Sequence, residues 1–274
     1  MKKDKKANPI FPKGVTRISE SASLRCEGLK KIHIPSSVKI IEKDAFCGCN
    51  SLKELFIPSN VSFIGDGAFC GCKSLAKIRV SPGNKYYDSR NGCNAIIETA
   101  TGKMIAACKN STIPDGVTTI GNWAFESCET LTELHIPDSV TRIGEHAFYC
   151  MGLKEIKLPD GITEIGSGAF YGCSALKRID IPDGVTKIGD GAFLYCSDLE
   201  EVKLPAGITE IESFTFSACW GLKKINIPDS VTKIGEAAFG SCSSLTEIHI
   251  PDSVTFIEDN AFSCCEGLKI LRGL

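Results

Sequence analysis

The stretch PDSVTKIGEAAFGSCSSLTEIHI, residues 228–250, decides the fold, because close copies of it fill most of the chain. Proline opens each copy and returns about every 23 residues, at Pro12, Pro35, Pro58, Pro114, Pro137, Pro159, Pro182, Pro205, Pro228 and Pro251. A unit this short cannot bury its own apolar side chains, so neighbouring units must stack and share one core. The chain is therefore expected to be a single elongated repeat solenoid.

The apolar pattern changes period within the unit. Ile248 and Ile250 alternate with polar residues, which predicts a half-buried strand. The residues before them are apolar at the spacing i, i+1, i+4 and i+7, namely Ala238, Phe239, Cys242 and Leu245. This spacing predicts one face of a short helix. We therefore expect one short parallel strand and one short helix in each unit.

One irregular unit, residues 82–113, interrupts the repeat. Within it, residues 95–98 and 103–107 can pair across residues 99–102, which predicts a β-hairpin insert. The expected organisation is a basic tail at residues 1–9 followed by one solenoid domain at residues 10–274.

The segment L-x-x-I-x-I, found at residues 29–34, 176–181 and 245–250, matches the strand core of leucine-rich repeats. The longer signature IPDSVTxIGxxAFxxCxxLxxIxI resembles the BspA-type, or treponemal-type, leucine-rich repeat family over roughly residues 10–272. The irregular unit resembles a hairpin-containing unit that is common in family members from gut and oral Bacteroidales. The resemblance implies a right-handed leucine-rich-repeat superhelix on surface-associated or secreted proteins that adhere to host proteins or other cells. It implies no enzymatic activity and no catalytic residue.

Ten of the fifteen cysteines are expected to form one column, a ladder of free thiols facing the core: Cys26, Cys49, Cys72, Cys128, Cys150, Cys173, Cys196, Cys219, Cys242 and Cys265. Buried cysteine behaves as a small hydrophobic residue, so this column is structural.

The remaining cysteines leave alternatives open. Cys47 and Cys70 occupy equivalent places in neighbouring units and can form a disulfide, and Cys93 and Cys108 flank the predicted hairpin and can bridge it. The two Cys-Gly-Cys segments, residues 47–49 and 70–72, invite a four-thiolate zinc site, but cysteines two apart on a helix point in different directions, which argues against it.

The exposed strand residues are the expected binding surface, because solenoids present their sheets as extended concave faces. Glu155, Lys157, Arg178, Asp180, Glu201 and Lys203 form a checkerboard of opposite charges, which reads either as a self-paired ladder or as a polar recognition face. Near the hairpin unit this pattern gives way to aromatic and arginine residues, which are typical of interface hot spots. The candidate ligand-binding residues are Phe56, Arg79, Tyr86 and Tyr87, although both tyrosines can instead pack the hairpin onto the array.

Several function classes find no support. The formal net charge of −2 provides no basic footprint for nucleic acid, and no apolar run is long enough to span a membrane. His33, His135 and His249 share one column but stand several units apart, so no metal site is expected among them; His146 is expected to be a surface residue. No catalytic motif, cofactor or phosphate-binding loop is predicted, and we expect no enzyme.

The predicted function is a noncatalytic adhesion or interaction module that binds a protein or glycan, with end-to-end self-association through an open terminal edge as a further expectation. The alternatives are a structural spacer without a ligand and an intracellular interaction scaffold. The resemblance implies a cell-surface or secreted location, whereas the lysine-rich residues 1–6 lack the apolar region of a signal peptide, so a cytoplasmic location stays open.

Overall fold

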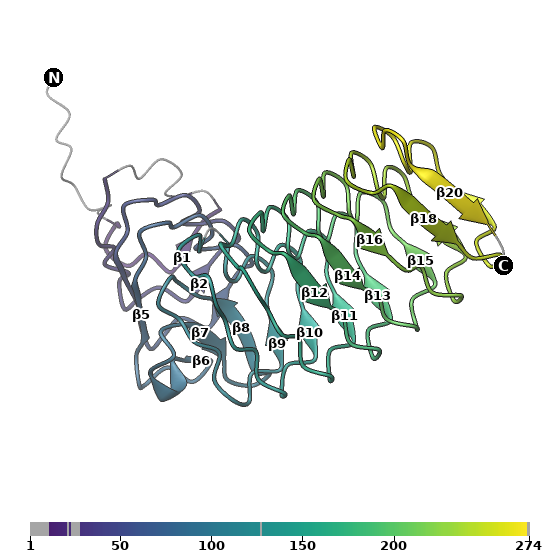
Figure 1. Cartoon of the computed structure of the whole chain (residues 1–274). Coiled ribbons are helices and arrows are strands. Elements are labelled where there is room, and N and C mark those ends of the chain that lie inside the picture. The colour runs from purple at the N-terminus through teal and green to yellow at the C-terminus, as the bar shows by residue number, and fades with distance from the viewer. Residues whose placement is uncertain (1–10, 21, 23–27, 127, 273–274) are drawn as a thin grey trace, which may run out of the picture.

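The protein is a solenoid of stacked coils, as the computed structural model shows (Figure 1). The structure describes residues 11–20, 22, 28–126 and 128–272. The expected basic tail and Cys26 therefore lie outside the described residues.

The L-x-x-I-x-I segments form one face of the solenoid, which we call the leucine face. Its strands run parallel in three sheets, β3-β5, β12-β14-β16 and β18-β20. They are β3 (Glu54–Ile57), β5 (Lys77–Val80), β12 (Arg178–Asp180), β14 (Glu201–Lys203), β16 (Lys224–Ile225), β18 (Glu247–Ile250) and β20 (Lys269–Arg272). Residues 131–137 and 154–158 belong to no strand, so this face is interrupted in the middle.

A second set of strands, two residues each outside the hairpin, lies on the side of the solenoid and forms what we call the side face. The first three are β1 (Arg17–Ile18), β2 (Ile40–Ile41) and β4 (Phe63–Ile64). A seven-stranded sheet follows, with β6 (Tyr87–Asp88), β7 (Ile96–Glu98), β8 (Lys103–Ala106), β9 (Thr119–Ile120), β10 (Arg142–Ile143), β11 (Glu164–Ile165) and β13 (Lys187–Ile188). The last three are β15 (Glu210–Ile211), β17 (Lys233–Ile234) and β19 (Phe256–Ile257).

The predicted short helix in each unit is wrong. Among the described residues the one helical element is a 3₁₀ turn, η1 (Arg90–Gly92), in the irregular unit. In the unit quoted above, Ala237 and Ser241 adopt φ values of 47° and 62°, which an α-helix does not contain. The N–H of Phe239 donates to the carbonyl of Ala261 in the next coil, where a helix would use its own preceding turn.

The segment is therefore a ladder of turns, which we call the turn face. Its N–H groups bond alternately within the coil and to the next coil, so the backbone is satisfied without a helix. The inward residues are nevertheless those that the helical spacing picked out, because Ala238, Phe239, Cys242 and Leu245 are all fully buried. Phe193, Phe216 and Phe239 stack along the core with ring centroids 5.5 Å apart.

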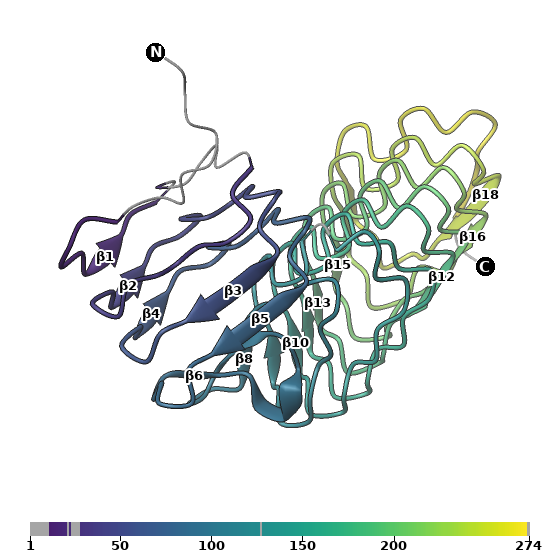
Figure 2. The same ribbon diagram turned by 90° about the vertical axis from the view of Figure 1, so that its left-hand side faces the viewer.

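The predicted hairpin is present, with β7 and β8 antiparallel, and it lies between the N-terminal and C-terminal coils (Figure 2). It divides the core in two. Ile96 and Ile105 pack into the N-terminal cluster, whereas their neighbours Ile97 and Met104 pack into the C-terminal one. Both faces of the hairpin are buried away from its tip, which explains why residues 96–97 and 104–106 are apolar in succession rather than alternating.

Side chains, rather than backbone, end the N-terminal sheets at the hairpin unit. The Asn94 side chain accepts a hydrogen bond from the Ile78 N–H at 2.7 Å and donates one to the Ala76 carbonyl at 2.9 Å, so it substitutes for a further strand beside β5. On the side face, the Tyr87 hydroxyl accepts from the Ile64 N–H of β4 at 2.9 Å. The two blocks of coils are thus joined by specific side-chain contacts.

Candidate ligand-binding site

Two of the four predicted site residues meet on the leucine face. Phe56 of β3 and Arg79 of β5 are directly paired in the strand register, and the Phe56 side chain is 47% exposed. With Lys31, His33 and Glu54 they line a hollow of about 230 Å³. The Glu54 carboxylate lies 3.9 Å from both the Lys31 ammonium and the Arg79 guanidinium, so it holds the two cations beside the exposed ring.

The two tyrosines do not join this hollow. Tyr87 is only 3% exposed, its hydroxyl bonds to β4, and burial raises its pKa to about 12. It is a packing residue, because the alternation of β6 points it into the N-terminal core, and its assignment to the binding patch was wrong. Tyr86, one residue earlier, points outward and is 51% exposed, but it does not line the hollow around Phe56.

A larger hollow of about 910 Å³ lies where the leucine face is interrupted, between residues 154–158 and β12. Its floor is aliphatic and its walls carry both charge signs, with Lys157, Arg178, Asp180 and Lys203 among the lining residues. It follows the one clean unit that is a residue short, from Pro137 to Pro159. The shortened spacing was the available signal for this hollow, and the sequence interpretation did not use it.

The charge checkerboard on this face is only partly self-paired. Arg178 contacts Asp180 at 3.1 Å and Glu201 at 2.9 Å, and Lys203 contacts Asp183 at 3.8 Å. Glu155 and Lys157 take part in none of the ion pairs found among the described residues. The hollow therefore presents free donors and acceptors beside an aliphatic floor, with no aromatic ring in its lining.

The thiol column is present with one correction. Each ladder thiol from Cys173 to Cys265 donates to the phenylalanine carbonyl one coil earlier, at 3.0–3.2 Å. Cys150 is not a member, because its unit is one residue short and Met151 takes the buried position. Cys150 instead occupies the turn position where other coils place Gly48, Gly71 or Gly172, with φ of 52°.

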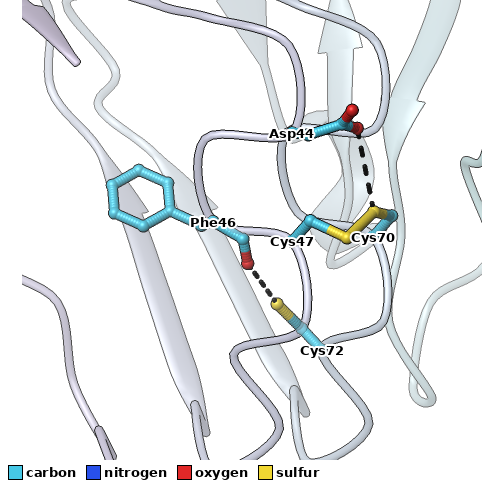
Figure 3. The surroundings of a disulfide bond; sticks show 5 residues. All are labelled: Asp44, Phe46, Cys47, Cys70 and Cys72. Carbon is cyan, nitrogen blue, oxygen red and sulfur yellow. Dashed lines mark hydrogen bonds between the residues drawn. A yellow bond between two sulfur atoms is a disulfide. The ribbon is translucent and has the colours of Figure 1, made fainter. Parts of the chain in front are cut away.

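The cysteines outside the column behave differently from one another. Cys47 and Cys70 form a disulfide between neighbouring coils. Cys93 and Cys108 are free and buried, so the alternative bridge across the hairpin is not made. The four-thiolate zinc arrangement is also absent, because the Cys72 thiol donates to the buried Phe46 carbonyl at 3.4 Å and does not converge with Cys70 (Figure 3).

The turn face also carries an aromatic run. Trp123 stacks on His146 with ring centroids 4.0 Å apart, and Tyr149 stacks on Tyr171 at 4.7 Å. Burial lowers the pKa of His146, whose ring was expected at the open surface. Each stacked pair covers one flat face of each of its two rings.

The comparisons with known proteins agree with this architecture. The model of the "BspA type Leucine rich repeat region", in six copies, matches residues 2–102, 97–219 and 169–272, and the chain belongs to this family. No protein of curated function matches the sequence significantly. Among the described residues, no helix has the length and apolar character to cross a membrane.

Several solved structures share the fold. A leucine rich cell surface protein from Faecalibacterium prausnitzii is 29% identical, covers 96% of this chain with a TM-score of 0.56, and is matched over 59% of its own length. A leucine-rich repeat protein from Bacteroides ovatus is 31% identical, with a TM-score of 0.59 and coverage of 96% of this chain and 74% of that one. The pneumococcal vaccine antigen PcpA has a TM-score of 0.71 over 95% of this chain and 66% of its own, and at 20% identity this likeness shows the fold alone.

Proposed function

We infer that this chain is a noncatalytic recognition module that binds a protein, or alternatively a glycan, through its leucine face. The observation that carries the inference is the pairing of exposed Phe56 with Arg79 over a hollow on an otherwise polar face. Aromatic and arginine side chains supply most hot-spot energy at protein interfaces. The neighbouring Lys31, His33 and Glu54 add polar contacts around the ring.

The larger hollow extends the same surface. It offers free donors and acceptors and no aromatic ring, which suits an extended polypeptide better than a stacked sugar. We propose that this chain acts at the cell surface or is secreted. The Faecalibacterium prausnitzii protein, described as a cell surface protein, supports that location.

The test is a binding screen of the purified chain against host matrix proteins, serum proteins and glycans, followed by single variants. Phe56→Ala and Arg79→Ala are expected to weaken a saturable interaction about tenfold or more each. Phe63→Ala is the matched control, because Phe63 is 52% exposed on β4 of the side face. All three variants should keep the parent's thermal transition.

Other outcomes separate the alternatives. Equal loss in Phe63→Ala would refute a site specific to the leucine face. Loss confined to Lys157→Ala would move the site to the larger hollow. Absence of any saturable ligand would favour the spacer, for which the ion pairs of Arg178 with Asp180 and Glu201 are the supporting observation. Self-association through the exposed edge at β20 stays a prediction, to be checked by sedimentation.

A further inference from the structure

Cys47 and Cys70 occupy the same place in two neighbouring coils, each directly after a core phenylalanine. Their Cα atoms are 4.7 Å apart, and the two sulfur atoms are joined as a disulfide on the turn face (Figure 3). Cys47 is half-buried and Cys70 is 8% exposed. Cys47 is therefore partly accessible from the surface, whereas Cys70 is as buried as the neighbouring column residue Cys72, which is also 8% exposed.

A carboxylate faces this pair. Asp44 stands at one of the two positive-φ positions of its coil, with φ of 54°, and the equivalent residue in the next coil is Gly67. A Cβ at Gly67 would collide with the Asp44 carboxylate, so the absent side chain provides the space into which Asp44 turns. Its Oδ1 lies 4.0 Å from the Cys70 sulfur, and all three ligand atoms lie within 4.8 Å of one another.

Asp44 and Glu126 form no ion pair among the described residues, although the Lys73 ammonium, which pairs with Glu129, lies near enough to Glu126 to favour its charged form. None of the ion pairs among the described residues includes Asp44. Glu126 follows Cys47 and Cys70 in the same column of the turn face, since it too comes directly after a core phenylalanine. Its Oε2 atom is buried and has no hydrogen-bond partner. The Asp44 carboxylate beside two sulfur atoms is a setting that a divalent cation would stabilise once the sulfurs are thiolates.

We propose that Asp44, Cys47 and Cys70 form a redox-controlled zinc site, closed by the disulfide and opened by reduction. Reduction by a dithiol transfers two electrons to the S–S bond, yields two thiols and converts the reductant to its own disulfide. Binding of Zn²⁺ then displaces the two thiol protons and leaves two thiolates and one carboxylate as ligands. Ligand atoms that share a tetrahedral zinc lie roughly 3.5–3.8 Å apart. The Asp44 Oδ1 and the Cys70 sulfur are 4.0 Å apart, and the two sulfur atoms must separate after reduction to share the ion.

This ligand set differs from the one that the Cys-Gly-Cys segments suggest. The intervening glycines, Gly48 and Gly71, have φ of 73° and 63°, and these turns direct Cys72 into the core. In the second segment, Cys72 therefore packs in the core, whereas Cys70 belongs to the proposed site. With three protein ligands, one coordination position stays open to water or to a further ligand.

The experiment uses the full chain, reduced anaerobically and freed of reductant, and titrates it with Co²⁺ as a spectroscopic probe before displacement by Zn²⁺. The expected result is one equivalent of tetrahedral, thiolate-bound Co²⁺ in the reduced protein and none in the oxidised protein. Zinc binding should release about two protons near neutral pH. Cys47→Ser should abolish the cobalt spectrum, and Asp44→Asn should weaken zinc binding at least tenfold.

If removal of a cysteine disturbs folding, Asp44→Asn still tests the site. Asparagine has the same shape as aspartate and tolerates positive φ, so this variant removes the carboxylate without disturbing the turn. Cys264→Ser is the matched control, since Cys264 is an exposed thiol outside the cluster. Equal binding by oxidised and reduced protein would overturn the proposal. So would unchanged affinity in Asp44→Asn, or a loss in Cys264→Ser as large as that in Cys47→Ser.

Discussion

The buried thiol column makes the stability of the protein sensitive to alkaline pH. Burial raises the pKa of Cys128 and of Cys173 from about 9 to about 12. Burial also raises the pKa of Cys196, Cys219 and Cys242 well above its usual value, and the hydrogen bond with Cys49 together with burial raises that of Cys72. These six thiols therefore stay protonated in the folded chain at pH 10, whereas in the unfolded chain they ionise.

The direction of the effect follows from proton linkage. Below pH 9 both states keep their thiol protons, and the column's full contribution to stability is present. Above pH 9 the unfolded chain alone releases protons, so the free energy of unfolding falls until the folded pKa near 12 is passed. At pH 10 each thiol costs roughly 1–2 kcal/mol relative to pH 7, and six together cost on the order of 10 kcal/mol. That loss is comparable with the whole stability of a typical domain.

The assay is urea unfolding between pH 7 and pH 10 in the presence of a phosphine reductant, which keeps the thiols from oxidising. The double variant Cys196→Ala and Cys219→Ala is less stable at pH 7, but its stability should fall by about 3 kcal/mol less between pH 7 and pH 10. Cys264→Ala, which removes an exposed thiol, should follow the parent. A double variant that loses as much stability as the parent over this range would refute the reasoning.

Two further pairs of substitutions test local geometry by the free energy of unfolding. Cys150→Gly should stabilise the protein by about 1 kcal/mol, because it removes a side chain from a residue with φ of 52°. Gly48→Ala should destabilise the protein by a similar amount, although an added Cβ meets nothing within 4 Å. A stabilised alanine variant would contradict this account. Tyr87→Phe should cost about 1–3 kcal/mol, because the Ile64 N–H of β4 loses its buried partner. Tyr86→Phe should change stability by less than about 0.5 kcal/mol, and equal effects of the two substitutions would exclude the proposed role of the Tyr87 hydroxyl.

The candidate site shows which residue placements the repeat period predicts and which it does not. Phe56 and Arg79 are 23 positions apart, one full repeat, so their pairing followed directly from the period. Tyr86 and Tyr87 lie in the irregular unit, where no period applies. Which of the two faces the core depended on the strand direction of β6 and on the position of β4, and neither is written in the local sequence.

The sequence by itself determined the solenoid, the inward columns and the hairpin, because each repeated residue meets the same neighbours in every coil. Only the tertiary structure decided the form of the turn face, since the N–H groups of residues such as Phe239 find their carbonyls in the next coil and not four residues back. It likewise placed Met151 where Cys150 was expected, because the core accepts whichever residue follows phenylalanine by three positions. The approach of Asp44 to Cys70 depends on the missing side chain of Gly67 one coil away, a long-range contact that no local pattern contains.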